Sequence, residues 1–237
     1  MPKSKRDKKI SLTQSKKKGL DFKQALISGI RENLDKYDRL FLFYVRNMRN
    51  VALKEVRTHW KHSRFFFGKS KLMALALGRT KESEQGDNVH KLANKIKGQC
   101  GLLFTNEKKD DVIEWFTSFV RPEFARSGFQ AQKTVQLKEG PLMDFTTSIE
   151  PNLRKLGLPT MVKNGKVHLM NDHTVCTAGD ILTPAQAQIL KLLGECLAQF
   201  KITLKCMWCK DGTFEELSKG SDNCNDESDN DVEMEEE

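Results

Sequence analysis

A basic segment around Gly68, Lys69 and Ser70 has the residue types that most often contact phosphate groups. Gly-Lys-Ser ends the phosphate loop of nucleotide-binding proteins, but that motif needs a glycine five residues before Gly68, where Ser63 stands. Three of the four intervening positions, 65–67, are phenylalanines, where backbone amides would have to cradle the phosphates. A nucleoside triphosphate site is therefore not expected. The segment instead predicts a basic turn that contacts the phosphates of a nucleic acid, with a merely solvated tip as the alternative.

Two pairs of potential metal ligands lack the additional ligands that a metal site requires. Cys206 and Cys209 have the spacing of half a zinc site, but no second pair of suitable spacing follows, and on a strand the two thiols would face opposite sides. His59 and His62 lack the glutamate and the spacing of a zinc-protease helix, so we expect them beside a basic turn or simply at the surface. No nucleophile elbow, dinucleotide loop or carboxylate pair is evident. The sequence predicts no metal, no cofactor, no small-molecule substrate and no enzymatic activity.

The charge of the chain is unevenly distributed. The net charge is +8, but residues 221–237 hold nine acids and no Lys or Arg, so residues 1–220 carry +17. A strongly basic body favours a polyphosphate partner, because each neutralised phosphate releases condensed counterions. The first 18 residues hold eight cations and one acid, a cluster that serves nuclear localisation and nucleic-acid contact equally well. The acidic tail is a solubilising brush, an RNA-mimicking inhibitor or a docking segment for basic partners, and its composition leaves these open.

The remaining composition predicts a globular protein inside the cell. No apolar run reaches the roughly 18 residues that span a membrane, and the basic N-terminal residues lead into no apolar segment of the secretory type. The six cysteines show no framework spacing, which predicts reduced thiols.

Helical and extended patterns alternate through the first half of the chain. Apolar spacing predicts helices at 20–36, 51–60, 72–77, 89–96 and 108–120, with strands at 40–45, 65–67 and 100–106 and a helix cap at Thr105 or Asn106. Strands that alternate with helices predict an α/β fold with a mostly parallel sheet and helices on both of its faces.

The pattern changes after Arg121 and returns at Thr183. Between them the chain is rich in Gly, Pro and polar residues, with short extended pieces at 134–137 and 166–170 and a turn at Asn164-Gly165. Thr183-Pro184 then predicts the start of a helix that runs through Leu197, and residues 200–208 alternate like a strand. We therefore expect a small α+β insertion domain within the α/β domain. The predicted organisation is a basic arm (1–18), the two parts of the α/β domain (19–131 and 181–212), the insertion (132–180) and a disordered acidic tail (213–237).

Long segments, in order, resemble one family of eukaryotic proteins. They are MPKSKRDKK, KKKGLDFKQALI, VRNMRNVALKEVRTHWKHSRFFFGKSKLM, GLLFTNEKKDDVIEWF, FARSG, KLGLPTMVKNGKVHLM and GDILTPAQAQILKLLGECLAQFKITLKCMW. Together they are similar to the mRNA turnover protein 4 family of ribosome assembly factors, which is related to the stalk-base ribosomal protein P-zero. The resemblance covers nearly the whole chain and implies an α/β RNA-binding domain interrupted by an insertion domain.

The resemblance also implies a function and its partners. A member of this family is expected to bind large-subunit (60S) rRNA at the stalk base, as a placeholder that P-zero later replaces. Expected partners are the pre-60S particle, the neighbouring L-eleven-type ribosomal protein and a dual-specificity phosphatase that acts as release factor. The expected location is the nucleus and nucleolus, with shuttling to the cytoplasm on pre-60S particles as a further expectation.

Carried over by position, the RNA-facing surface falls on basic residues of the arm and of the first domain, with the Ala125–Gly128 loop nearby. The candidate residues are Lys3, Lys5, Arg6, Lys8, Lys9, Arg49, Arg57, Lys61, Arg64, Gly68, Lys69 and Lys71. The stalk protein typically has Gly-Lys-Asn-Thr where this chain has Gly68-Lys69-Ser70-Lys71, so Lys71 adds a cation.

Two alternatives remain at this point. The chain could be the stalk-base ribosomal protein itself, but P-zero continues past its last strand into helices that bind the acidic stalk dimers, whereas here a short acidic segment follows Trp208. A metal-dependent or nucleotide-using enzyme is the second alternative, and bound zinc or saturable nucleotide binding would support it.

Overall fold

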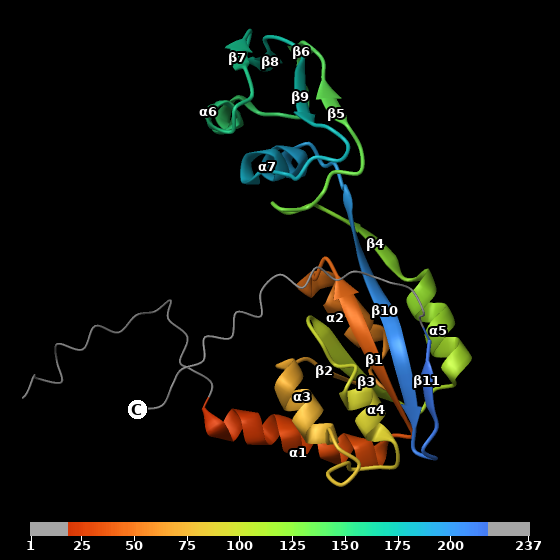
Figure 1. Cartoon of the computed structure of the whole chain (residues 1–237). Helices are drawn as coiled ribbons and strands as arrows, with labels where there is room; N and C mark the ends of the chain where they lie inside the picture. The colour runs from red at the N-terminus through yellow and green to blue at the C-terminus, as the bar shows by residue number, and fades with distance from the viewer. Residues whose placement is uncertain (1–18, 218–237) are drawn as a thin grey trace, which may run out of the picture. The chain divides into compact units, whose positions relative to one another are not determined.

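The structure, a computed structural model, describes residues 19–217. The elements shown in Figure 1 are, in chain order, α1 (Leu20–Lys36), β1 (Arg39–Arg46), α2 (Asn50–His59), β2 (Arg64–Phe66), α3 (Ser70–Leu77), α4 (Val89–Ala93), β3 (Cys100–Thr105), α5 (Lys109–Ser118), β4 (Val120–Glu123), β5 (Val135–Leu137), β6 (Gly140–Pro141), the 3-10 helix η2 (Thr147–Ile149), α6 (Glu150–Lys155), β7 (Thr160–Lys163), β8 (Lys166–Leu169), β9 (His173–Cys176), α7 (Pro184–Leu192), β10 (Ala198–Cys209) and β11 (Phe214–Glu216). Within the described residues, none of the helices is long and apolar enough to cross a membrane.

The described chain forms two compact units. Unit 1 comprises residues 19–42, 62–106 and 205–217, and unit 2 comprises Phe43–Lys61 and Glu107–Leu204. The boundaries fall inside β1 and β10, so each of these strands contributes residues to both units.

The largest sheet has the strand order β11-β10-β1-β3-β2, and β4 also pairs with β10. Three of its pairings are antiparallel: β10 with β11, β10 with β4, and β2 with β3. The prediction of a mostly parallel sheet is therefore wrong. One reason is that β10 and β11 are joined by a turn of only four residues, which permits only the antiparallel arrangement. Another is that β4 is a short, polar strand (VRPE), which the apolar pattern did not reveal.

The two long strands follow from their sequences. The run LFLFYV lies in β1, where Leu40, Phe41, Leu42 and Phe43 are fully buried, as predicted for a strand covered on both faces. In β10 the buried residues alternate with partly exposed ones from Ala198 to Cys206, which confirms the predicted strand and extends it by two residues at its start.

Unit 1 buries the apolar side of α1 against its neighbours. Ile30 and Leu34 of α1 are buried, and α1 packs along α3, whose Met73 and Leu77 are buried as well (Figure 1). At the start of β2 the buried Ser63 hydroxyl hydrogen-bonds to the Thr105 hydroxyl at 2.8 Å, which joins the start of β2 to the end of β3.

Unit 2 contains the insertion, which has a core of its own. Its strands form two small antiparallel sheets, β5-β9 and β6-β8-β7. Asn164 and Gly165 join β7 to β8 with φ of 51° and 73°, a pair of positive values typical of the predicted tight turn. Buried side chains from Ala125 to Ala198, among them Leu153 and Val167, fill the space between these sheets, α6 and α7.

The helix that follows the insertion begins as predicted. The Thr183 hydroxyl accepts from the Gln186 backbone N–H, the Gln186 side-chain oxygen accepts from the Thr183 N–H, and Pro184 occupies the first turn. The helix ends at Leu192, earlier than the predicted end at Leu197.

Two local predictions were wrong. Asn106 does not cap α5, which begins after Lys108; the Asn106 side chain instead accepts from the Asp38 N–H at 2.9 Å. Residues 214–216 belong to β11, although the disordered acidic tail was expected to begin at 213. The prediction for 218–237, like that for the basic arm (1–18), lies outside the described residues.

Candidate nucleic-acid interface

The β2–α3 turn presents three of the predicted cations. Arg64 is exposed on β2, with its guanidinium 5.8 Å from the centre of the Phe66 ring, and this contact orients the side chain. Lys69 is the exposed residue at the N-cap of α3, and Lys71 is exposed in its first turn. Among residues 19–217, no side chain forms a cap hydrogen bond at the N-terminus of α3. A helix N-terminus attracts anions, so the amides and the cations both favour a phosphate.

Gly68 has a structural role in this turn. A Cβ on Gly68 would lie 2.7 Å from Cδ2 of Leu26 in α1, so a larger residue in this turn would require the Leu26 side chain to shift. The packing of this turn against Leu26 therefore accounts for a glycine at position 68, and no nucleotide-binding loop is needed to explain it. The charge of the turn comes from its neighbours in the sequence.

The β1–α2 turn uses its arginine differently. Arg49 donates from Nη2 to the Phe124 carbonyl at 2.5 Å, and its Nε lies 3.4 Å from Oε2 of Glu123. Its side chain is only 26% exposed. Arg49 therefore ties the start of α2 to the segment after β4, and a part of its charge is already neutralised.

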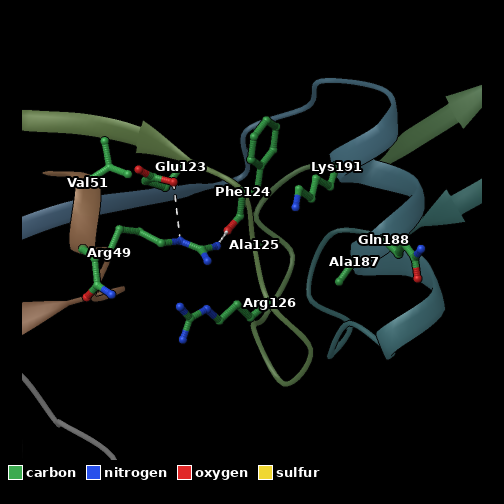
Figure 2. Close-up of a pocket in the computed structure, with 10 residues that line it drawn as sticks. Arg49, Val51, Glu123, Phe124, Ala125, Arg126, Ala187, Gln188 and Lys191 are labelled. Atoms are coloured by element: carbon green, nitrogen blue, oxygen red, sulfur yellow. Dashed lines mark hydrogen bonds and ion pairs between the residues drawn. The ribbon is translucent and has the colours of Figure 1, made fainter. Parts of the chain in front are cut away.

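Next to Arg49 the surface of unit 2 is hollowed. The hollow has a volume of about 340 Å³, and besides Arg49 two cations line it, Arg126 and Lys191. Figure 2 shows Lys191 extending from α7 toward the Phe124–Arg126 segment, whereas Arg126 extends from that segment toward Arg49, on the side away from α7. Arg126 donates to the Met48 carbonyl at 3.3 Å, whereas no carboxylate in residues 19–217 forms an ion pair with Lys191. Glu123 supplies the one acid of the lining, so the hollow is net positive and suits an anion.

Sequence reasoning anticipated this hollow only in part. The Ala125–Gly128 loop, which contains Arg126, was expected near the RNA-facing surface because of the family resemblance. Lys191 was missed, since it lies far along the chain from Arg49 and its helix carries no charge pattern that marks it out. Only the folded chain shows that Arg49, Arg126 and Lys191 line the same hollow.

The remaining candidates are divided between the units. Arg57 and Lys61 are exposed on and just after α2, in unit 2, whereas Arg64, Gly68, Lys69 and Lys71 belong to unit 1. The structure thus brings the β2–α3 residues together in one unit and the α2 residues together in the other. The five arm residues, Lys3, Lys5, Arg6, Lys8 and Lys9, lie outside the described part of the chain.

The cysteines considered as half of a zinc site differ in environment. Cys206 is buried on β10, and burial raises the pKa of its thiol to about 11, with the carboxylate of Glu216 adding to the shift. Cys209 is half-buried at the end of the same strand. Burial thus favours the protonated thiol of Cys206 over the thiolate.

Two family models match consecutive parts of the chain. The model described as "Ribosomal protein L10" matches residues 18–121, and the model of the insertion domain found in the 60S ribosomal protein of that family matches residues 125–194. Among curated relatives, "Ribosome assembly factor mrt4" of Dictyostelium discoideum is 44% identical, over 89% of this chain and 95% of its own. The protein of the same name from Schizosaccharomyces pombe is also 44% identical, over 92% and 95%.

The chain belongs to the Mrt4 family of ribosome assembly factors. The expected family resemblance is thereby confirmed, together with the relation to the stalk-base protein. "Large ribosomal subunit protein uL10" of Thermococcus sibiricus is 25% identical over 73% of this chain, but only 52% of that relative is covered. The Mrt4 family is thus a paralogue of uL10. The relatives named here are ribosome assembly factors and a ribosomal protein.

The ranges matched by the family models do not coincide with the predicted domains. The matched insertion, 125–194, is wider at both ends than the predicted 132–180. It includes Arg126 and Lys191, whereas Arg49 falls within the range of the first model. The hollow therefore combines residues from both matched segments.

Proposed function

We propose that the protein is a biogenesis factor of the large (60S) ribosomal subunit that binds rRNA at the stalk base. It would hold the site of the stalk protein P-zero until that protein replaces it. The observation that carries this proposal is the exposed basic β2–α3 turn, in a chain whose relatives of matching length are named ribosome assembly factors.

The β2–α3 turn is suited to the RNA backbone. Arg64 and Lys69 are exposed, and no carboxylate in residues 19–217 forms an ion pair with either of them. A cation that has no carboxylate partner breaks no ion pair when it binds a phosphate. Each such contact also releases counterions from the RNA. The α3 amides would add hydrogen bonds to the same phosphate.

Unit 2 would supply further contacts to the same RNA. Arg57 on α2 and Lys61 just after it are exposed cations, and the hollow of Arg49, Arg126 and Lys191 would take one more phosphate. The basic arm would extend the contact along the RNA, as its eight cations suggest.

The finer parts of the proposal come from the family. In this proposal the protein joins pre-60S particles in the nucleolus and lies near the L-eleven-type ribosomal protein. A dual-specificity phosphatase later releases it. The alternative, a permanent ribosomal protein, is less favoured because the chain is 44% identical to two Mrt4 relatives and 25% identical to the uL10 relative.

A charge reversal tests the RNA contact. The variant R64E/K69E/K71E should bind a stalk-base rRNA fragment about 100-fold more weakly or worse, because it turns three attractive contacts into repulsive ones. The matched control, K155E/K163E/K166E, reverses three exposed lysines of the insertion and should bind normally. Fluorescence anisotropy at several salt concentrations measures both, and circular dichroism checks the fold. Affinity of the first variant within twofold of the unchanged protein would refute the assignment.

Sedimentation separates the proposed function from the alternative. The tagged protein should travel with nuclear pre-60S particles and be absent from translating ribosomes. Stable presence in translating ribosomes would favour a structural ribosomal protein.

A further inference from the structure

Three aromatic rings form a stacked column on unit 2. The ring of His59 lies 4.8 Å from that of Trp115 with 12° between their planes, and Trp115 lies 4.8 Å from Phe119 with 11° between them. Aromatic pairs in proteins prefer offset-stacked or edge-to-face arrangements, and here two offset stacks follow one another in a single column. The spacing and the small angles resemble a short stack of nucleobases.

The inner part of this column is held by the core. Trp115 and Phe119 are one helical turn apart at the end of α5, which places their rings over one another. Trp115 also meets the buried rings of Trp60 and Phe116 edge to face, at 5.5 and 4.9 Å. Phe119 packs edge to face on the buried Phe200 at 6.2 Å. The column is therefore rigid before any ligand arrives.

The outer end of the column is exposed. His59 is the last residue of α2 and is exposed to solvent. Trp115 covers one face of its ring, and Trp60 meets it nearly edge-on at 6.0 Å. In the described part of the chain no further ring stacks on His59, so the column ends with an aromatic face toward solvent.

The charges around this end match a nucleic acid. Arg57 and Lys61, two residues to either side of His59, are both exposed, and Glu55 pairs with Arg121. A histidine at a helix C-terminus is favoured by the helix dipole whatever the angle of its ring. That preference explains its position but not the parallel stacking or the rigid support below it.

We propose that His59 is a stacking platform for an unpaired nucleobase of the bound RNA. The base would lie on the outer face of the imidazole and extend the column, while Arg57 and Lys61 hold the flanking phosphates. The inference rests on the proposed function, since the RNA is the one that the basic turn binds. Stacking of a base on an aromatic side chain contributes about 1–3 kcal/mol, or roughly 5- to 150-fold in affinity.

Three variants and two RNAs test the platform. His59→Ala should bind a stalk-base fragment with unpaired bases at least about fivefold more weakly, and His59→Phe should restore binding because it keeps a ring. The control His168→Ala removes a half-buried histidine of β8 and should bind normally. A fully paired RNA of equal length should bind the unchanged protein and His59→Ala alike. With 2-aminopurine at the unpaired positions in turn, one position should lose fluorescence on binding the unchanged protein and not on binding His59→Ala.

The outcomes separate this inference from the proposed function. If the unchanged protein does not bind the fragment, the proposed function fails. If it binds and His59→Ala binds within twofold, the function stands and the platform is refuted. Loss in His59→Ala that His59→Phe does not restore would mean that the imidazole acts through its charge or hydrogen bonds, which also refutes stacking. Equal loss on the paired RNA, with a lower melting temperature, would assign His59 to folding alone.

Discussion

The β1–α2 and β2–α3 turns are both basic in sequence but use their cations differently. In the first, Arg49 contacts the Phe124 carbonyl and Glu123, so its side chain holds two segments of unit 2 together. In the second, Lys69 extends from the start of α3 into solvent. A cation close to an acid and a carbonyl thus serves mainly stability, whereas one that lacks them is available to a ligand.

The largest effect expected from this comparison is on the stability of the β1–α2 turn. Arg49→Ala should lower the free energy of unfolding by about 2 kcal/mol, because it leaves the Phe124 carbonyl and the Glu123 carboxylate without their charged partner. Urea unfolding followed by circular dichroism measures the change. A loss below about 0.5 kcal/mol would show that Arg49 is no more structural than a surface residue.

A smaller loss of stability is expected at the N-terminus of α7, the helix that carries Lys191. Thr183→Ala removes the hydroxyl that accepts from the Gln186 N–H and should cost about 1 kcal/mol in the same unfolding experiment. Thr183→Ser keeps the hydroxyl and serves as the control. Equal losses in the two variants would mean that the capping box does not stabilise α7.

The smallest effect on stability is expected at Lys69. Lys69→Ala should change the free energy of unfolding by less than about 0.5 kcal/mol, since no ion pair within the described residues holds the side chain. It should, however, lower the slope of log affinity against log salt for the rRNA fragment by about 1, the share of one phosphate contact. Lys163→Ala, on the exposed β7–β8 hairpin, is the matched control. A normal salt slope combined with lost stability would reverse the comparison between the two turns.

Local patterns predicted most of the elements because their causes are local. The apolar run of β1, the alternation in β10, the Asn164-Gly165 turn and the Thr183 cap each follow from nearby residues. Strand direction was not predictable in this way. It depends on which strands meet, and β4 and β11 have too few apolar residues to be recognised before their pairing with β10 is known.

In the candidate site, too, features that depend on neighbouring residues were predictable and features that depend on distant residues were not. The charge of the β2–α3 turn could be predicted because its cations are neighbours in the sequence. The engagement of Arg49 could not, since its partners Glu123 and Phe124 lie more than 70 residues away. The same holds for the ring column, in which His59 meets Trp115 across 56 positions, so that only the folded chain brings the two rings together.

The long strand β10 has a consequence for how the chain folds during synthesis. It pairs with β4 through Ala198–Lys201 and with β11 through Cys206–Trp208, and it neighbours β1, which is made some 150 residues earlier. Contacts of such large sequence separation form slowly and must await the last strand. On the ribosome, the edge of β1 that pairs with β10 would therefore stay open until β10 has been made, although β3, the other neighbour of β1, is made about 90 residues earlier. A nascent chain of this protein should be a client of chaperones that cover open strand edges.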